Sequence, residues 1–310
     1  MSINDPLIED QVVFEKKKIW STSAVHALSK LRMGVMGNAA SREFELECRY
    51  KRYLAEFGEA NSDIYISTFS KSGTTWMQLI LYQLTTSGDM GFDHLFDVSP
   101  WIWYSSIRQV KPVLTPLPRL LKSHDDYCRF KSGRRGRFVF VTRDGRDVCI
   151  SLYHHRRNFK GFEGSFDEHF EEFLNGNDYN WFEHTRRWVE NKYCLPVIYV
   201  RFEDLKESFE KTVRHLASLM KIAVTEEVIK RTIDRCSFEA MKHHEFQLGP
   251  RNSHFVNAQS APYHVKNPDQ FIRRGEIGEG LAVLSDEQLR AYKARFDRSL
   301  KHLELLKEYC

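Results

Sequence analysis

The chain has 310 residues, enough for one large α/β domain or two small ones. Its 46 lysines and arginines minus 42 aspartates and glutamates leave a net charge of +4, and this near balance argues against a dominant nucleic-acid-binding tail. We therefore expect no nucleic-acid partner. No apolar run approaches the roughly 18 residues of a membrane span, so no integral membrane segment is expected.

The six cysteines are scattered, and none forms a C-x-x-C pair. No histidine cluster has zinc-finger spacing either. We therefore expect reduced thiols, no bound metal and a cytoplasmic location. The N-terminal residues lack the apolar core of a secretory signal, so no export signal is expected.

Short apolar runs alternate with helical patterns, and residues 1–55 precede them as a helical segment. We expect this segment to pack on a single domain formed by residues 56–310. The alternation predicts the α/β class, with a central, mostly parallel sheet flanked by helices. The expected strands cover residues 64–69, 119–122, 137–142 and 197–202.

The first expected strand leads into the loop Lys71-Ser72-Gly73-Thr74-Thr75, and an amphipathic helix follows. The first N–H groups of a helix have no partner inside it, and the helix dipole adds partial positive charge, so this turn is suited to a phosphate. Gly73 allows close backbone approach, and Lys71 adds a full charge. The alternative is an ordinary strand–turn–helix connection with an incidental lysine. Because Lys71 precedes the only glycine, the loop does not match the ATP-binding Walker A pattern.

Two long stretches interrupt the alternation of strands and helices. Residues 92–118 are rich in proline and aromatic side chains, and residues 245–280 contain Gly, Pro, Asn and Ser throughout. Loops of this length are uncommon in compact domains unless they are lids or binding loops. We expect the second to be a functional lid, whereas the first is either a core-packing loop or a substrate pocket. The candidate pocket residues are Trp101, Trp103 and Tyr104.

Arg143 follows the expected strand at 137–142, at the sheet edge where open α/β sheets bind ligands. Ser151 lies eight residues further on, about two helical turns away. An arginine and a hydroxyl group on one side could hold a second phosphate. Arg143 could instead pair with Asp144 or Asp147.

Lys122 and His124 lie at the end of the strand at 119–122, and alternate residues of a strand share a face. A histidine beside a predicted phosphate site is a candidate general base. The alternative is a structural role, because most lone histidines are structural.

Towards the C-terminus, Ser285-Asp286-Glu287-Gln288 has the pattern of a helix start. The helix that follows is expected to carry one apolar face into the core. That face comprises Leu289, Tyr292, Phe296, Leu300 and Leu303.

Together these motifs resemble those of the cytosolic sulfotransferases. Residues 69–76 are similar to that family's Tyr-Pro-Lys-Ser-Gly-Thr-Thr-Trp, and residues 122–124 to its Lys-Thr-His. The spacing of Arg143 and Ser151 matches its second phosphate segment, and residues 271–275 resemble its Phe-Met-Arg-Lys-Gly. The four motifs follow the family's order over roughly residues 40–300.

The resemblance implies the P-loop-kinase-like sulfotransferase fold, with 3′-phosphoadenosine 5′-phosphosulfate (PAPS) as donor and 3′,5′-adenosine bisphosphate (PAP) as product. It implies transfer of the sulfonate to a hydroxyl or amine of a small acceptor, without a metal. His124 would be the base, and Lys71 and Lys122 would act on the transferring group. The implied cofactor-binding residues are Lys71, Ser72, Gly73, Thr74, Thr75, Trp76, Arg143, Ser151, Phe238, Arg273, Arg274 and Gly275.

The sequence departs from the family at several positions. Ser70 stands in place of proline, and Gly278-Glu279-Gly280-Leu281 in place of Gly-Asp-Trp-Lys. The short dimer segment that follows in the family is not evident, so the oligomeric state is left open.

Two other functions fit a strand–loop–helix phosphate site. A nucleotide-dependent small-molecule kinase would need magnesium and a Walker-type loop. A non-catalytic nucleotide- or anion-binding protein would explain the basic residues but would give His124 no role. If the chain is a sulfotransferase, the aromatic residues of the first long stretch favour an apolar acceptor.

Overall fold

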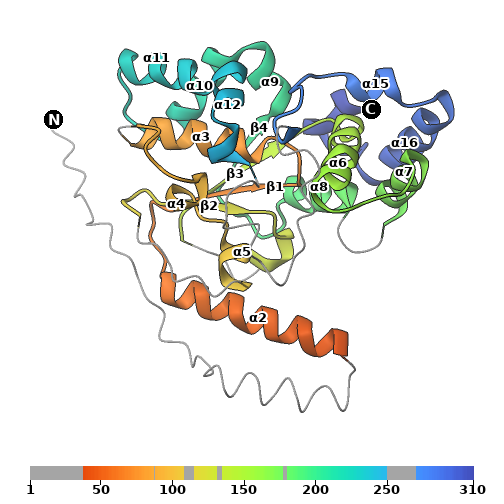
Figure 1. Cartoon of the computed structure of the whole chain (residues 1–310), viewed down its shortest axis with the longest axis horizontal. Helices are drawn as coiled ribbons and strands as arrows, with labels where there is room; N and C mark the ends of the chain where they lie inside the picture. The colour runs from red at the N-terminus through yellow and green to blue at the C-terminus, as the bar shows by residue number, and fades with distance from the viewer. Residues whose placement is uncertain (1–37, 87, 108–114, 131–134, 177–179, 250–269) are drawn as a thin grey trace.

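A computed structural model of the chain describes residues 38–86, 88–107, 115–130, 135–176, 180–249 and 270–310 (Figure 1). Within these ranges, β1 (Ile64–Thr68), β2 (Leu120–Ser123), β3 (Arg137–Thr142) and β4 (Val197–Arg201) form one sheet. Every pairing is parallel, and the strand order is β2-β1-β3-β4. The expected parallel sheet is therefore confirmed.

Helices precede, separate and follow these strands. The helices of the described ranges are α2 (Asn38–Phe57), α3 (Thr74–Thr85), α4 (Leu95–Val98), α5 (Ile102–Ile107), η1 (Tyr127–Phe130), α6 (Gly145–Phe159), α7 (Phe166–Asn175), α8 (Trp181–Glu190), α9 (Phe202–Glu207), α10 (Phe209–Leu219), α11 (Glu226–Arg235), α12 (Phe238–His243), α13 (Glu245–Leu248), α15 (Glu279–Val283), α16 (Asp286–Ser299) and η3 (Glu304–Tyr309).

Several expected element ends differ from the structure by one residue or more. The first strand ends at Thr68, one residue before the expected end, and the second covers Leu120–Ser123, one residue later than expected at both ends. Phe202 opens α9 instead of ending β4. The C-terminal helix starts at the capping box of Ser285 as expected but ends at Ser299, so Leu303 lies beyond it.

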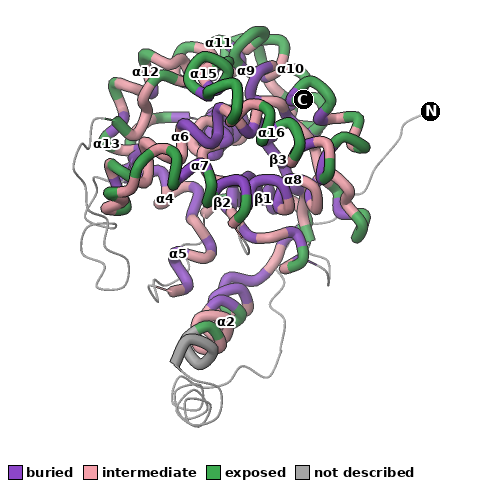
Figure 2. Tube along the Cα trace, turned by 90° about the vertical axis from the view of Figure 1, so that its right-hand side faces the viewer, coloured by how far each residue is buried: buried purple, intermediate pink, exposed green. Residues whose placement is uncertain are grey.

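Successive strand residues face different cores, because side chains alternate across a sheet. Ile66 and Val139 pack with residues of α3, α10 and α11 on one face. Tyr65 and Phe138 pack on the other face with residues of α2, α5 and α8. Figure 1 shows α3 and α11 on the opposite side of the sheet from α5 and α2. Both faces are covered, and every residue of β1 and β2 is buried (Figure 2).

A further core cluster lies beside the sheet, among α6, α7, α8 and α16. Tyr292, Phe296 and Leu300 belong to it, so these members of the expected apolar face do lie in the core. Figure 1 shows α16, α7 and α8 grouped on the side where the C-terminus lies.

The predicted N-terminal helical segment is described only from residue 38, and residues 1–37 lie outside the described ranges. The C-terminal part of α2 buries Tyr50, Leu54 and Phe57. Its end is tied to the sheet by Arg119, which donates to the Phe57 carbonyl at 2.8 Å. Arg119 also pairs with Asp63 through two hydrogen bonds of 2.8 and 2.7 Å.

We expect Arg119→Ala to destabilise the fold by about 3–5 kcal/mol, because it leaves the buried carboxylate of Asp63 without its partner. Urea unfolding followed by circular dichroism measures this loss. The matched control is Arg135→Ala, which removes an exposed guanidinium and should change the unfolding free energy by less than about 0.5 kcal/mol. Equal stability of the two variants would contradict the role assigned to Arg119.

Candidate active site

The loop after β1 contains two residues in the left-handed backbone region. Lys71 has a φ of 70° and Gly73 a φ of 100°. A Cβ on Gly73 would lie 2.9 Å from the Phe202 ring, so both the conformation and the space favour glycine. Gly73 is the N-cap of α3 and has no side chain to accept hydrogen bonds from the first-turn N–H groups. That turn is therefore suited to an external anion.

A cavity of about 550 Å³ opens beside this loop at the carboxyl edge of the sheet. Most of the sequence-predicted site residues line it, although they come from distant parts of the chain. Those lining it are Lys71, Gly73, Thr74, Thr75, Trp76, Trp101, Lys122, His124, Arg143, Ser151, Phe238, Arg273, Arg274 and Gly275. Ser72 is buried beneath the loop, and neither Trp103 nor Tyr104 contributes to the described lining.

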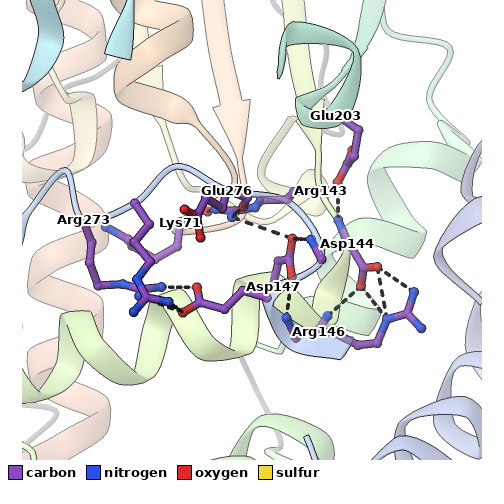
Figure 3. Close-up of polar contacts among 12 residues, drawn as sticks. Lys71, Arg143, Asp144, Arg146, Asp147, Glu203, Arg273 and Glu276 are labelled. Carbon is purple, nitrogen blue, oxygen red and sulfur yellow. Dashed lines mark hydrogen bonds and ion pairs between the residues drawn. The ribbon is translucent and has the colours of Figure 1, made fainter. Parts of the chain in front are cut away.

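Arg143 connects three segments of the cavity wall. Its guanidinium donates to the Lys71 carbonyl at 3.1 Å and to the Glu276 carbonyl at 2.9 Å, as Figure 3 shows in part. It also lies 4.1 Å from the centre of the Phe202 ring. One alternative from the sequence is a pairing of Arg143 with Asp147. The nearest guanidinium nitrogen and carboxylate oxygen of these two residues are 3.9 Å apart, farther than either carbonyl contact.

The carboxylate of Asp147 is hydrogen-bonded mainly by backbone N–H groups. Its carboxylate accepts from Gly278 N–H at 2.9 Å and from Gly280 N–H at 2.7 Å (Figure 3). A Cβ on Gly280 would lie only 2.4 Å from the Cβ of Arg146, so α15 can approach α6 this closely only with glycine there. Asp147 thus attaches the segment after Gly275 to the N-terminal end of α6.

A second carboxylate acts on the same segment. Glu279 pairs with both guanidinium nitrogens of Arg273 and lies 3.4 Å from Arg274. These arginines lower the pKa of Glu279, although its partial burial opposes this. Glu279 therefore balances part of the positive charge at this end of the cavity.

His124 lies at the end of β2 with one ring nitrogen committed. Its Nδ1 is 2.9 Å from the Thr68 carbonyl, which can only accept, so Nδ1 carries the proton and Nε2 is left as the basic nitrogen. Burial and the nearby Lys122 hold the pKa of His124 well below its usual value. The imidazole is therefore uncharged at neutral pH, as a general base must be.

Two lysines of the cavity, Lys71 and Lys122, have lowered pKa values. Burial together with repulsion from Arg143 and Arg273 lowers the pKa of Lys71 to about 8. Burial together with repulsion from Lys71 and Lys160 lowers the pKa of Lys122 to about 7. A bound anion would favour the charged form of both lysines and raise these pKa values.

The predicted aromatic residues point to different sides. Trp101 lines the cavity, and its ring lies nearly perpendicular to the His124 ring, with 5.3 Å between the centroids. Tyr104 stacks behind Trp101 at 5.5 Å. Trp103 instead lies against Tyr50 of α2, at 5.7 Å, in the opposite core. Trp101 is thus the one member of the three that a molecule in the described cavity would touch.

Trp76 and Phe238 line another part of the cavity wall. The indole N–H of Trp76 donates to the Cys236 carbonyl at 2.9 Å, and its ring lies 5.2 Å from that of Phe209. The Phe238 ring lies directly over Gly275, where an added Cβ would meet it at 3.1 Å. Both rings therefore contribute aromatic surface to the cavity wall.

Sequence reasoning did not assign many residues of the cavity wall to the site, among them Phe96, Phe271, His155 and Lys160. Phe96 lies in the aromatic stretch and Phe271 in the last motif, so the motifs covered both positions without assigning them. His155 follows Ser151 by four residues on α6, and this spacing alone predicts a shared helix face. Nothing local distinguishes Lys160.

Among the described residues, no group of three or more histidine, cysteine, aspartate or glutamate side chains could hold a metal ion. The described helices also include none with the length and apolar character needed to span a membrane.

Comparison with known proteins shows to which family the chain belongs. The family model described as a sulfotransferase domain matches residues 61–304. The chain belongs to the sulfotransferase family. The expectation of a sulfotransferase, and so of an enzyme, is confirmed by this match.

The relatives of this sulfotransferase cover most of its length. Mouse sulfotransferase 1B1 is 27% identical over 274 residues, which are 83% of this chain and 88% of that protein. Rabbit amine sulfotransferase is 26% identical over 262 residues, 81% of this chain and 85% of that protein.

Solved structures agree with the expected sulfotransferase fold. Mouse sulfotransferase SULT7A1 complexed with PAP aligns with a TM-score of 0.63 at 20% identity and covers 86% of this chain and 93% of its own. Retinol dehydratase in complex with androsterone and inactive cofactor PAP aligns with a TM-score of 0.64 at 17% identity, covering 83% and 86%.

We expect Asp147→Asn to loosen the segment of residues 273–280, because an amide group can accept only one of the two backbone hydrogen bonds and presents N–H groups to the other. The variant should unfold about 1–3 kcal/mol more easily and be cleaved faster by protease in that segment. Asp297→Asn, on the surface of α16, is the control and should change neither measurement appreciably. An unaltered cleavage pattern in Asp147→Asn would rule out the attachment.

Proposed function

We propose that the protein transfers the sulfonate group of PAPS to a hydroxyl group, or an amine, of a small acceptor. The observation that carries the proposal is an uncharged histidine and two lysines in one cavity, beside a helix N-terminus suited to phosphate. Membership in the sulfotransferase family supports the reaction class. PAP in the names of two structures of similar fold supports the donor.

The donor would occupy the cavity along the carboxyl edge of the sheet. We assign its 5′-phosphate to Lys71 and the first turn of α3, where Thr74 and Thr75 add hydroxyl groups. We assign the 3′-phosphate to Arg143 and Ser151, together with the segment of residues 273–275. The adenine would lie between Trp76 and Phe238, whose rings border the cavity.

The transfer would proceed in line. The acceptor oxygen forms a bond to sulfur as the bond from sulfur to the bridging phosphate oxygen breaks, and the electron pair leaves with that oxygen. His124 Nε2 takes the acceptor proton, and the Nδ1–H bond to the Thr68 carbonyl holds the ring in the required tautomer. Lys71 would stabilise the charge that develops on the bridging oxygen, and Lys122 the transferring sulfonate.

The chain has further features that fit this function. All six cysteines are free thiols, which suits a reducing compartment, so we propose a cytoplasmic enzyme. Trp101 and Phe96 supply apolar surface beside His124 for the body of a small acceptor.

We expect His124→Ala to lower turnover by about 10²–10⁴-fold, because general base catalysis contributes that much. Affinity for PAP, measured by calorimetry, should change little because the imidazole acts on the acceptor. The matched control is His302→Ala, which removes an exposed imidazole and should retain full turnover. Near-normal turnover in His124→Ala would reject the base assignment.

The same calorimetry separates the other candidate functions. A sulfotransferase should bind PAP without magnesium and more tightly than ATP. Tight ATP binding that depends on magnesium would favour a kinase, and PAP binding without sulfonate transfer to any hydroxyl or amine acceptor would favour a non-catalytic binder.

We expect PAP affinity to fall as the pH rises above about 8. An anion stabilises the protonated form of Lys71, whose pKa in the free protein is about 8, so binding is strongest below that pH. Each pH unit above it should weaken binding by up to about tenfold until the lysine of the complex also titrates. Calorimetry in two buffers of different ionisation enthalpy should register proton uptake near pH 8, and Lys71→Met should reduce that uptake to the part contributed by Lys122, whose pKa is about 7. An affinity that is constant across this range would contradict the assignment.

A further inference from the structure

The cations of the cavity wall form two groups, which we name the arginine end and the lysine end. The arginine end comprises Arg143, Arg273 and Arg274, and the lysine end comprises Lys71 and Lys122. In the proposed function, the arginine end holds the 3′-phosphate of the nucleotide. The cavity wall also contains Glu279, whose carboxylate contacts this end. Glu279 and a 3′-phosphate would therefore bind the same guanidinium groups.

Glu279 contacts both arginines of the segment of residues 273–275. Its Oε1 accepts from the Arg273 guanidinium at 2.8 Å, and its Oε2 accepts from the other terminal nitrogen of the same group. The dashed lines at Arg273 in Figure 3 mark this bidentate contact. Arg274 lies 3.4 Å from Oε1. A phosphate pairs with a guanidinium through the same two parallel N–H groups, so the carboxylate occupies the geometry that a phosphate would use.

The Glu279 carboxylate is charged and largely enclosed. Only 8% of its side chain is exposed, compared with 20% of Arg273 and 58% of Arg274. Burial opposes ionisation, but the hydrogen bonds and the charge of Arg273 outweigh it and lower the pKa of Glu279, so the group is ionised at neutral pH. A phosphate at these arginines would meet a negative charge that water screens only in part.

The backbone on both sides of Glu279 is fixed. Gly278 and Gly280 donate their N–H groups to Asp147 at 2.9 and 2.7 Å. Gly280 also packs so closely on α6 that an added Cβ would lie 2.4 Å from the Cβ of Arg146. We therefore expect the carboxylate to leave Arg273 by rotation of its own side chain, without movement of α15. A displaced carboxylate stays near Arg273 and can return when the nucleotide leaves.

We propose that Glu279 competes with the 3′-phosphate of the nucleotide for Arg273, and that this competition promotes release of the product PAP. The inference rests on the proposed function and adds a residue that sets the affinity for the nucleotide. A phosphate can carry two negative charges and a carboxylate only one, so PAP still binds. Its net affinity is reduced because the ion pair of Arg273 with Glu279 must first be broken. Product release limits turnover in many enzymes, and here the re-formed ion pair favours it.

Two nucleotides that differ only in the 3′-phosphate test the competition. PAP carries this group, and adenosine 5′-phosphate (AMP) lacks it. We expect Glu279→Gln, which removes the charge and keeps the shape, to tighten PAP binding by about three- to thirtyfold in calorimetry. The affinity for AMP should stay the same, which also shows that the variant is folded.

The tighter binding should appear as slower dissociation of PAP, because changes at a binding interface act mainly on the dissociation rate. Stopped-flow measurement of tryptophan fluorescence follows this step, since Trp76 lies in the cavity wall. Glu226→Gln is the matched control. Glu226 forms the same kind of bidentate pair with Arg214, at 2.7 and 2.6 Å, outside the described cavity lining. This control should change neither the PAP affinity nor the dissociation rate.

Three results would overturn the proposal. The first is that Glu279→Gln binds PAP no more tightly than the unaltered protein. The second is that PAP leaves the variant no more slowly. The third is that AMP binding tightens as much as PAP binding, which would indicate a general effect of charge. Failure of the unaltered protein to bind PAP would instead contradict the proposed function.

Discussion

The parallel pairing of β1 with both β2 and β3 is the constraint on which the site depends. Ser67 lies opposite Ser123, and Thr68 opposite Val141, so the three strands end at nearly the same level. Parallel strands direct their following loops to one edge of the sheet, where α/β proteins bind ligands. Lys71, Lys122 and Arg143, which are 51 and 21 positions apart in the sequence, therefore meet around one cavity.

Core layers cover both faces of the sheet and support the cationic residues at its carboxyl edge. Lys71, Lys122 and Arg143 are all desolvated, and Lys71 is repelled by Arg143 and Lys122 by Lys71, so this arrangement costs folding free energy. A rigid sheet with both faces covered can sustain that cost. In the proposed function, a ligand with several negative charges would offset this repulsion, so the cost to the fold would be recovered as affinity for the anion. The carboxylates Asp147 and Glu279 stabilise the arginine end but not the lysine end.

The parts of the site that the sequence predicts are those whose chemistry is local. A strand, a loop with Lys71 and Gly73 and a helix start are consecutive, so the phosphate loop can be read directly from the chain. The strand ends at Lys122 and Arg143 follow from the alternation of strands and helices. Both features predict residues that the structure places in the cavity wall, without any knowledge of distant contacts.

What the sequence does not predict depends on side-chain direction or on contacts between remote segments. Trp101 and Trp103 are two residues apart at the start of a short helix, so they lie on different sides, and no pattern tells which one faces the cavity. The attachment of Gly278 and Gly280 to Asp147 joins segments more than a hundred residues apart. The place of Lys160 in the cavity wall depends on where α6 ends. Most of the lid expected at residues 245–280 lies outside the described residues.

A crystal structure of the protein with PAP tests the central claim most directly. The account predicts the 5′-phosphate at the first turn of α3 beside Lys71, and the 3′-phosphate within hydrogen-bonding distance of Arg143 and Ser151. It also predicts that the part of the cavity bounded by Trp101, His124 and Lys160 remains open for an acceptor. A nucleotide bound in the reverse direction, or bound so that it fills the space beside His124, would contradict the account.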